Sequence, residues 1–369
     1  MKIRSIEIQR LRDVPMPHPL QLAWSPGTVK RRASVTVVRV LSDDGLEGIG
    51  TGGSPKALRE VADRLVGQDP FDTERHARTL RHSGLAWGLE IALWDLIGKA
   101  CDHPLYKIWG GFTSRVRGYA SLVETTSPQD TAERSLGLIE EGFTGVKIRL
   151  HGDRLQDDLA VAQAVRDAVG DSIALMADAN QARVPFSPAD ETGPVWDLRR
   201  ARKTADALDE MGFVWLEEPL GRYDFDGLAE LSRSVSIAIA GGEKNRYLHE
   251  FASMLDRGCY DIVQPDALVS EGIGQLRKIA ALAEVRHRLC IPHHGGGGIG
   301  AFAHLQLAAA VPNAPWMEIL RDRAGGASWP AQLVVTQPLM VDAGGWVRLP
   351  EAPGLGLELD EGFIQTYAN

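Results

Sequence analysis

Eight short apolar runs, each separated from the next by an amphipathic segment, constrain the fold of this chain more than any other feature of its sequence. The runs occupy residues 116–122, 145–150, 173–178, 213–217, 237–242, 260–265, 288–293 and 315–319. Strands and helices that alternate at this spacing favour a parallel sheet closed into a (β/α)8-type barrel. We therefore expect an α/β protein whose barrel domain covers residues 114–325.

The segments on either side of the barrel have a different pattern. Residues 34–41 are β-branched and predict a strand, whereas residues 55–66 and 84–100 have helical periodicity. Strands followed by helices indicate an α+β capping domain, which we place at residues 1–113. The turn-rich residues 326–369 are too short for a separate domain and are expected to pack back against the cap.

The charge and cysteine content exclude several classes of partner. The chain has 40 Lys and Arg against 49 Asp and Glu, a net charge of −9, which disfavours binding to nucleic acid or to an anionic membrane. Its three cysteines are far apart, which points to a reducing compartment. There is neither an apolar N-terminal region nor an 18-residue apolar run. We therefore expect a cytoplasmic homo-oligomer that binds a small molecule.

Seven of the eight apolar runs end in ionisable side chains, at the carboxyl end where barrels carry their active sites. In chain order these residues are Lys147 with Arg149, Asp178, Glu217, Glu243, Asp266, His293 and Glu318. Successive ends lie about one βα unit apart, so the side chains should converge on one ring at the mouth of the barrel. Such a series is not a packing pattern and predicts an active site.

Three of these residues are carboxylates on adjacent strands: Asp178, Glu217 and Glu243. They would repel one another unless a cation lay between them. Oxygen ligands at rigid positions suit Mg²⁺, which keeps its other positions for water and substrate. The alternative, that they are helix caps or ion-pair partners, explains one carboxylate more easily than all three.

A candidate general base follows on the next strands. Asp266 can hold the imidazole of His293 in one tautomer and raise its basicity. His294 is a competing candidate, and a surface histidine with an unrelated aspartate is the structural alternative. Lys147 and Arg149 share strand parity, so their side chains should point the same way.

Two glycine-rich segments suggest rival functions. Residues 48–53 fit G-x-G-x-x-G, but they follow a hairpin instead of opening a βαβ unit, so we expect a flexible cap loop near the substrate, not a dinucleotide site. Residues 295–298 follow the seventh strand, where many barrels bind phosphate. A phosphosugar isomerase or aldolase would leave the acidic trio unexplained. A non-catalytic binding protein on the same fold should have lost part of the ring.

Taken together, these motifs resemble the enolase superfamily and, within it, the mandelate racemase-like group. The matching segments are Gly88–Asp95, Asp178–Asn180, Trp215–Pro219, Gly242–Glu243, Pro265–Ala267 and Pro353–Gly356. The resemblance implies a (β/α)7β TIM-like barrel with an α+β N-terminal cap that the C-terminal segment completes. It also implies Mg²⁺ held by Asp178, Glu217 and Glu243, and a His293–Asp266 dyad as the base.

The resemblance assigns further roles at the strand ends. Glu318 matches the acid that hydrogen-bonds the substrate carboxylate, and Lys147 matches the first lysine of a Lys-x-Lys motif. Arg149 replaces the second lysine, which serves the family as a base on the face opposite the histidine. Arginine stays protonated and is a poor base, so this departure favours chemistry with His293 as the single base.

The predicted reaction is the dehydration of a sugar acid, an aldonate or aldarate, to a 2-keto-3-deoxy acid through an enediolate. Racemisation or epimerisation and lactone cycloisomerisation are the alternatives within the superfamily. Asn180 is a candidate substrate-binding residue, and His18 and Trp24 are candidates from the cap loops that choose the substrate. The proline-rich link at residues 181–196 is a candidate wall of the same site.

Overall fold

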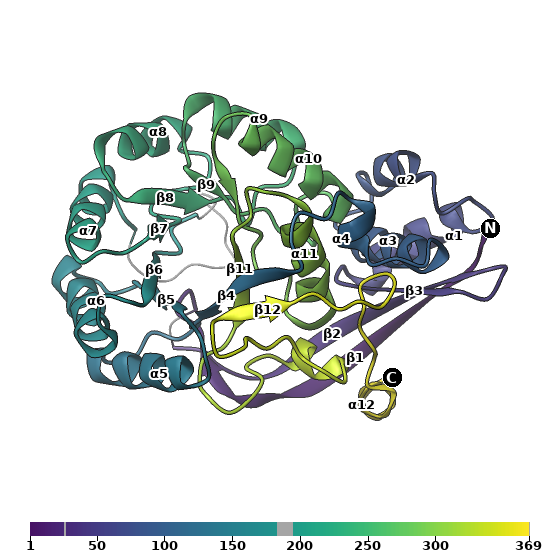
Figure 1. Ribbon diagram of the computed structural model, residues 1–369, viewed down its shortest axis with the longest axis horizontal. Coiled ribbons are helices and arrows are strands. Elements are labelled where there is room, and N and C mark those ends of the chain that lie inside the picture. Colours follow the sequence, from purple (N-terminus) through teal and green to yellow (C-terminus); the bar gives the residue numbers. More distant parts are fainter. Residues whose placement is uncertain (26, 183–194, 369) are drawn as a thin grey trace.

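The computed structural model of the protein describes residues 1–25, 27–182 and 195–368. In these residues an N-terminal α+β cap lies beside a (β/α)7β barrel, and the C-terminal segment returns from the barrel to the cap (Figure 1). The predicted fold class is thereby confirmed. The limits of the three segments, residues 1–113, 114–325 and 326–369, stay predictions. None of the described helices is both long and apolar enough to cross a membrane.

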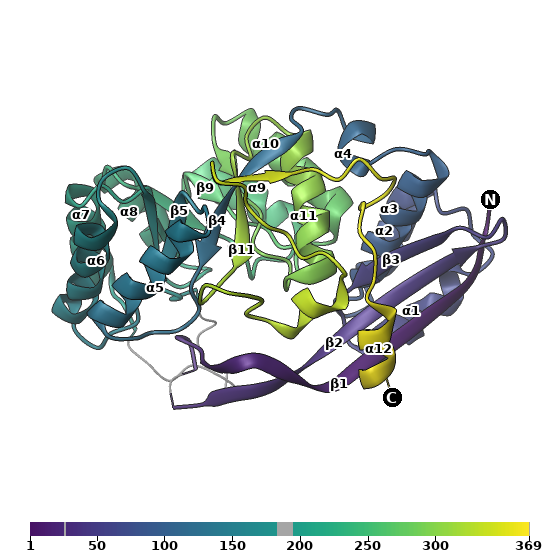
Figure 2. The same cartoon turned by 60° about the horizontal axis from the view of Figure 1, so that its bottom comes forward.

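The cap consists of a three-stranded antiparallel sheet covered by helices. Its elements are β1 (Ile3–Gln21), β2 (Val29–Ser42), β3 (Glu47–Thr51), α1 (Pro55–Leu65), α2 (Thr73–Leu80), α3 (Gly88–Ala100) and α4 (Leu105–Ile108). Strands β1 and β2 pair from Ile3 opposite Ser42 to Gln21 opposite Val29. Because this hairpin is so long, it extends beyond the cap and runs along the barrel (Figure 2). The end of the hairpin that is far from the cap therefore lies next to the barrel.

Two glycines of β3 allow helix α3 to pack closely on the sheet. A Cβ atom on Gly48 or Gly50 would lie 2.1 or 2.0 Å from a backbone oxygen of α3. Residues 48–51 form a buried strand, so our expectation of a flexible loop is wrong for this part of residues 48–53. The glycines of this motif therefore allow a helix and a sheet to pack closely together.

The barrel contains eight parallel strands and seven helices among the described residues. The strands are β4 (Arg115–Ser121), β5 (Gly145–Arg149), β6 (Ala174–Asp178), β7 (Trp215–Glu217), β8 (Ala238–Gly241), β9 (Ile262–Val263), β10 (Leu289–Cys290) and β11 (Trp316–Leu320). The helices are α5 (Pro128–Glu140), α6 (Leu155–Val169), α7 (Leu198–Glu210), α8 (Phe225–Ser234), α9 (Leu248–Arg257), α10 (Ile273–Glu284) and α11 (Gly298–Ala310). Strand β11 pairs in parallel with β4, and each strand overlaps one of the predicted runs.

Large side chains fill the barrel interior beneath the strand ends. Tyr119, Met176 and Trp215 are fully buried there, and the rings of Tyr119 and Trp215 meet edge to face at 5.4 Å. Residues two apart on a strand point to the same side. Asp178 and Glu217 therefore lie above Met176 and Trp215 and point into the barrel.

A buried carboxylate joins the cap to the barrel. Glu90 of α3 accepts hydrogen bonds from the backbone N–H groups of Ile273 and Gly274, at 2.8 and 2.9 Å, where α10 begins. The indole of Trp94 donates a third hydrogen bond at 2.8 Å. Burial outweighs these hydrogen bonds and raises the pKa of Glu90 to about 7.

The C-terminal segment contacts both parts of the molecule. It contains the 3₁₀ helix η1 (Pro330–Val334), β12 (Trp346–Arg348) and α12 (Glu361–Tyr367). Strand β12 pairs antiparallel with β4 of the barrel. Glu361 of α12 accepts two hydrogen bonds from Arg39 of β2, at 2.7 and 2.8 Å.

Candidate active site

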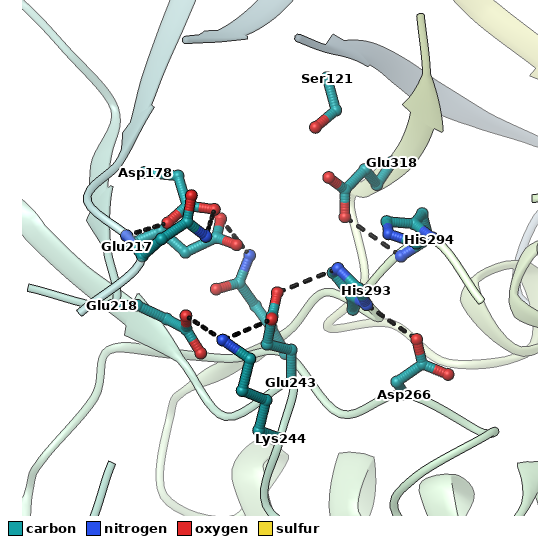
Figure 3. Close-up of polar contacts among 12 residues, drawn as sticks. Ser121, Asp178, Glu217, Glu218, Glu243, Lys244, Asp266, His293, His294 and Glu318 are labelled. Carbon is teal, nitrogen blue, oxygen red and sulfur yellow. Dashed lines mark hydrogen bonds and ion pairs between the residues drawn. The ribbon is translucent and has the colours of Figure 1, made fainter. Parts of the chain in front are cut away.

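The three predicted metal-ligand carboxylates meet at the carboxyl ends of adjacent strands (Figure 3). Asp178 ends β6, Glu217 ends β7 and Glu243 follows β8, and each has an oxygen within 4.8 Å of the other two. Burial raises the pKa of Glu217 to about 7, and the neighbouring carboxylates of Asp178 and Glu318 add to the shift. A divalent cation would relieve this repulsion, and three oxygen donors at this spacing fit Mg²⁺.

Lys147 is fully buried among the carboxylates. Its Nζ atom lies 2.7 and 2.8 Å from the two carboxylate oxygens of Glu217 and 2.9 Å from Oε1 of Glu318. Burial by itself disfavours the charged amine, but Glu217, Glu318 and Asp178 outweigh that effect and raise the pKa of Lys147. Lys147 is therefore a fixed cation and is unsuited to accept a proton at neutral pH.

Arg149 is held by acceptors on several sides. Its guanidinium donates hydrogen bonds to the Leu122 carbonyl at 2.7 Å and to Oγ of Ser121 at 3.1 Å. It also donates to Oδ1 of Asn180 at 3.3 Å and forms an ion pair with Asp178. Burial opposes the charge, yet the carboxylate of Asp178 keeps the pKa of Arg149 raised. Arg149 thus fixes two strand ends together and stays a cation.

His293 lies between two carboxylates, as Figure 3 shows. Its Nδ1 is 2.7 Å from Oδ2 of Asp266, and its Nε2 is 2.9 Å from Oε2 of Glu243. Burial alone would lower the pKa of His293, but Glu243 and Asp266 outweigh burial and raise it well above its usual value. With Asp266 behind Nδ1, Nε2 is the atom that can exchange a proton on the side of the acidic trio.

His294 has a different environment, although its ring lies only 3.8 Å from that of His293. Its Nδ1 accepts a hydrogen bond from the Gly296 N–H at 2.8 Å, and its own backbone N–H donates to Glu318 at 3.1 Å. Burial, together with the charge of His293, lowers the pKa of His294 to about 3. The geometry therefore favours His293, the histidine with the aspartate partner, as the base.

A cavity of about 470 Å³ lies between the cap and these strand ends. The cap contributes Leu22, Trp24, Ser25 and Lys30 to its lining, and the barrel contributes Arg149, Asn180, Glu243, Lys244, His293 and His294. The guanidinium carbon of Arg149 lies 5.4 Å from the centroid of the Trp24 ring. The cavity therefore gives a ligand access to His293 of the dyad and to Glu243 of the acidic trio.

Two of the three predicted substrate-binding residues line the cavity, and the third lies elsewhere. Trp24 and Asn180 line the cavity. His18 lies on β1 beside Asp322, with Nε2 and Oδ2 3.9 Å apart, and it is not among the described lining residues. Most of the predicted wall at residues 181–196, namely residues 183–194, lies outside the described residues. The substrate-binding roles stay predictions.

Sequence reasoning missed two polar residues of the site. Gln264 donates a hydrogen bond to Glu217 at 2.8 Å and directly follows β9. A search of strand ends for every polar residue, beyond the ionisable ones, would have found it. Lys30 carries no such signal, because only the path of the β1–β2 hairpin brings it to the barrel.

Comparison with protein families accounts for nearly the whole chain. Residues 5–110 match the mandelate racemase/muconate lactonizing enzyme N-terminal domain, and residues 130–363 match the enolase C-terminal domain-like family. The L-talarate/galactarate dehydratase of Salmonella typhimurium is 30% identical over 89% of this chain and 81% of the relative. The D-galactarolactone cycloisomerase of Agrobacterium fabrum is also 30% identical, over 98% of this chain and 99% of the relative.

A solved structure has the same fold from end to end. A racemase from Streptomyces coelicolor A3(2) with bound magnesium superposes with a TM-score of 0.84 and 26% identity, covering all of both chains. The relatives thus include a sugar acid dehydratase, a cycloisomerase and a racemase. Family, fold and strand-end residues agree, and this chain belongs to the enolase superfamily, in the mandelate racemase/muconate lactonizing enzyme group.

Proposed function

We propose that this protein is a Mg²⁺-dependent dehydratase of sugar acids. It would remove the proton α to the substrate carboxylate and expel the β-hydroxyl as water, giving a 2-keto-3-deoxy acid. The observation that carries this proposal is the His293–Asp266 pair beside the acidic trio. Arg149, held by its hydrogen bonds and its ion pair with Asp178, occupies the position of the second base. A single base suits elimination better than racemisation, which needs proton transfer on both faces.

Asp178, Glu217 and Glu243 would hold the ion. When bound, Mg²⁺ supplies positive charge where the enediolate develops negative charge. Lys147 adds a permanent positive charge near the end of β5, because the surrounding carboxylates keep it protonated. Glu318 forms an ion pair with Lys147 and accepts a hydrogen bond from the backbone N–H of His294. Burial alone would raise the pKa of Glu318, but Lys147 keeps it lowered. Glu318 would therefore have to gain a proton when the substrate binds before it could donate a hydrogen bond to the substrate carboxylate.

The proton transfers fall to the dyad. The contact of Nε2 with Glu243 favours the protonated imidazole, so His293 can act as a base only when Glu243 is engaged as a metal ligand instead. Nε2 of the neutral imidazole would then take the α-proton, and the carboxylate of Asp266 stabilises the imidazolium that results. The same imidazolium then donates its proton to the departing β-hydroxyl, which leaves as water. The imidazole is thereby returned to its starting state. The enol that remains tautomerises to the 2-keto-3-deoxy acid, as its C2 hydroxyl loses a proton and C3 gains one, and no outside oxidant or reductant is needed.

Lactone cycloisomerisation is the second candidate, and the near-complete overlap with the galactarolactone cycloisomerase favours it. It begins with the same removal of an α-proton by a base. The two reactions differ in what leaves the β-carbon: water in the dehydratase and a ring oxygen in the cycloisomerase.

A panel of aldonates, aldarates and their lactones tests this proposal. We expect 2-keto-3-deoxy acid formation that depends on Mg²⁺, is lost after chelation and returns when the ion is added back. Glu217→Gln, which removes one ligand charge, should weaken the response to Mg²⁺. Full activity in metal-free protein, or an epimerised acid as the main product, would contradict the proposal.

A further inference from the structure

Lys30 differs from the other cations that line the cavity. Arg149 is paired with Asp178, and Nζ of Lys244 lies 3.5 Å from carboxylate oxygens of both Glu218 and Glu243. Among the residues that the structure describes, Lys30 has no carboxylate within the 4.0 Å of an ion pair. Its ammonium instead lies 4.6 Å from the centroid of the Trp329 ring.

The position of Lys30 places its charge on the cap side of the cavity. It lies at the start of β2, opposite Leu20 in the hairpin that runs along the barrel (Figure 2). Glu243 of the acidic trio and His293 of the dyad line the same cavity from the strand ends of the barrel. The cavity thus has cationic groups on both sides: Arg149 and Lys244, each paired with a carboxylate, on the barrel, and Lys30 on the cap.

A partly buried ammonium without an anionic partner is costly, because burial removes water that would otherwise solvate it. Burial lowers the pKa of Lys30 for the same reason. The Trp329 ring offsets part of that cost through a cation–π contact. An anionic group of a ligand would restore the missing pairing and gain a charge-assisted hydrogen bond.

We propose that Lys30 binds a second anionic group, at the end of the substrate far from the reacting carbon. The substrate would then be a sugar acid charged at both ends, as in a dicarboxylic acid or a phosphorylated monocarboxylic acid. This inference rests on the proposed function for the first end, where the reacting carboxylate lies over the strand ends of the barrel.

The test uses sets of six-carbon sugar acids that are identical from C1 to C5. Within a set, C6 carries a hydroxyl, a carboxylate or a phosphate ester, so that only the far charge changes. Calorimetry with Mg²⁺ on the His293→Asn protein measures binding without turnover. Keto acid formation by the unmodified protein measures the reaction separately.

Three variants isolate the charge of Lys30. Lys30→Gln removes it, and Lys30→Arg keeps it. Arg31→Gln removes the next charge along β2, which is exposed and, by strand alternation, points to the other face. Thermal unfolding checks that each variant is folded.

We expect a doubly charged acid to bind about tenfold or more tightly than its C6-hydroxyl counterpart, the range of one charge-assisted contact. Lys30→Gln should abolish this preference, whereas Lys30→Arg and Arg31→Gln should keep it. Whether the carboxylate or the phosphate series shows the preference identifies the source of the charge.

Equal binding of singly and doubly charged acids, or a preference that persists in Lys30→Gln, would overturn the inference. The two proposals can fail separately. Lys30-dependent binding without keto acid formation would leave the inference standing and reject the dehydratase. Keto acid formation with no effect of charge at C6 would support the dehydratase and reject the role of Lys30.

Discussion

Replacement of Arg149 by lysine is the sharpest test of the single-base chemistry. A lysine keeps the charge and restores the residue that matches the family's second base. In this chain, however, the amine would lie beside Asp178, whose carboxylate favours its protonated form, as the surrounding carboxylates do for Lys147. We therefore expect Arg149→Lys to lose activity without gaining an epimerase reaction.

The loss can be estimated from the hydrogen bonds of the guanidinium. An ammonium can keep the ion pair with Asp178 and reach one further acceptor, so about two of Leu122 O, Ser121 Oγ and Asn180 Oδ1 lose their donor. Each buried group left without a partner costs about 1–3 kcal/mol. The free energy of unfolding should therefore fall by about 2–6 kcal/mol.

Urea denaturation measures this stability change, and NMR in deuterated water follows the α-proton and any epimer. Arg154→Lys is the matched control, because Arg154 is exposed and pairs only with its helix neighbour Asp157 among the described carboxylates. Epimer formed by Arg149→Lys at a rate comparable with exchange would refute the argument that Asp178 keeps this position protonated.

Three further predictions follow from contacts in the site and the cap. His293→Asn should slow α-proton exchange by about 10²–10⁴-fold and His294→Asn by less, measured by NMR in deuterated water; the reverse order would make His294 the base. Burial raises the pKa of Glu90 from the usual 4.5 to about 7, so the native state favours the protonated acid more than the unfolded state does. Glu90 therefore contributes a free energy of unfolding that is fully present below pH 4.5 and is lost as the pH rises to 7. Relative to Glu90→Gln, the unmodified protein should lose about 2–3 kcal/mol between pH 4.5 and 7.5 in urea denaturation, and parallel profiles would contradict this. Gly50→Ala should destabilise the cap by about 2–3 kcal/mol or more in the same assay, because its Cβ would lie 2.0 Å from a backbone oxygen of α3; an unchanged midpoint would count against that packing.

The barrel and the ring of strand-end residues could be predicted from the sequence because both depend on local periodicity. Each apolar run identifies a strand without reference to its partners, and all parallel strands of a barrel present their carboxyl ends on one side. A residue such as Asp178 or Glu217 therefore reaches the site through its position on its own strand. The same logic finds Asp266 and His293 from the spacing of consecutive βα units.

The cap hairpin and the partners of individual side chains depended on the tertiary structure. Strand β1 owes its length to pairing with β2 and brings Lys30 to the barrel, a relation that no local pattern of residues encodes. Gly48 and Gly50 were informative only once α3 was known to lie against them. The sequence motifs already put His293 before His294, but the physical reason came from the tertiary structure, which places Asp266 against Nδ1 of His293. Contacts between distant segments depend on how whole elements pack, and that packing decides which neighbouring group each charge meets.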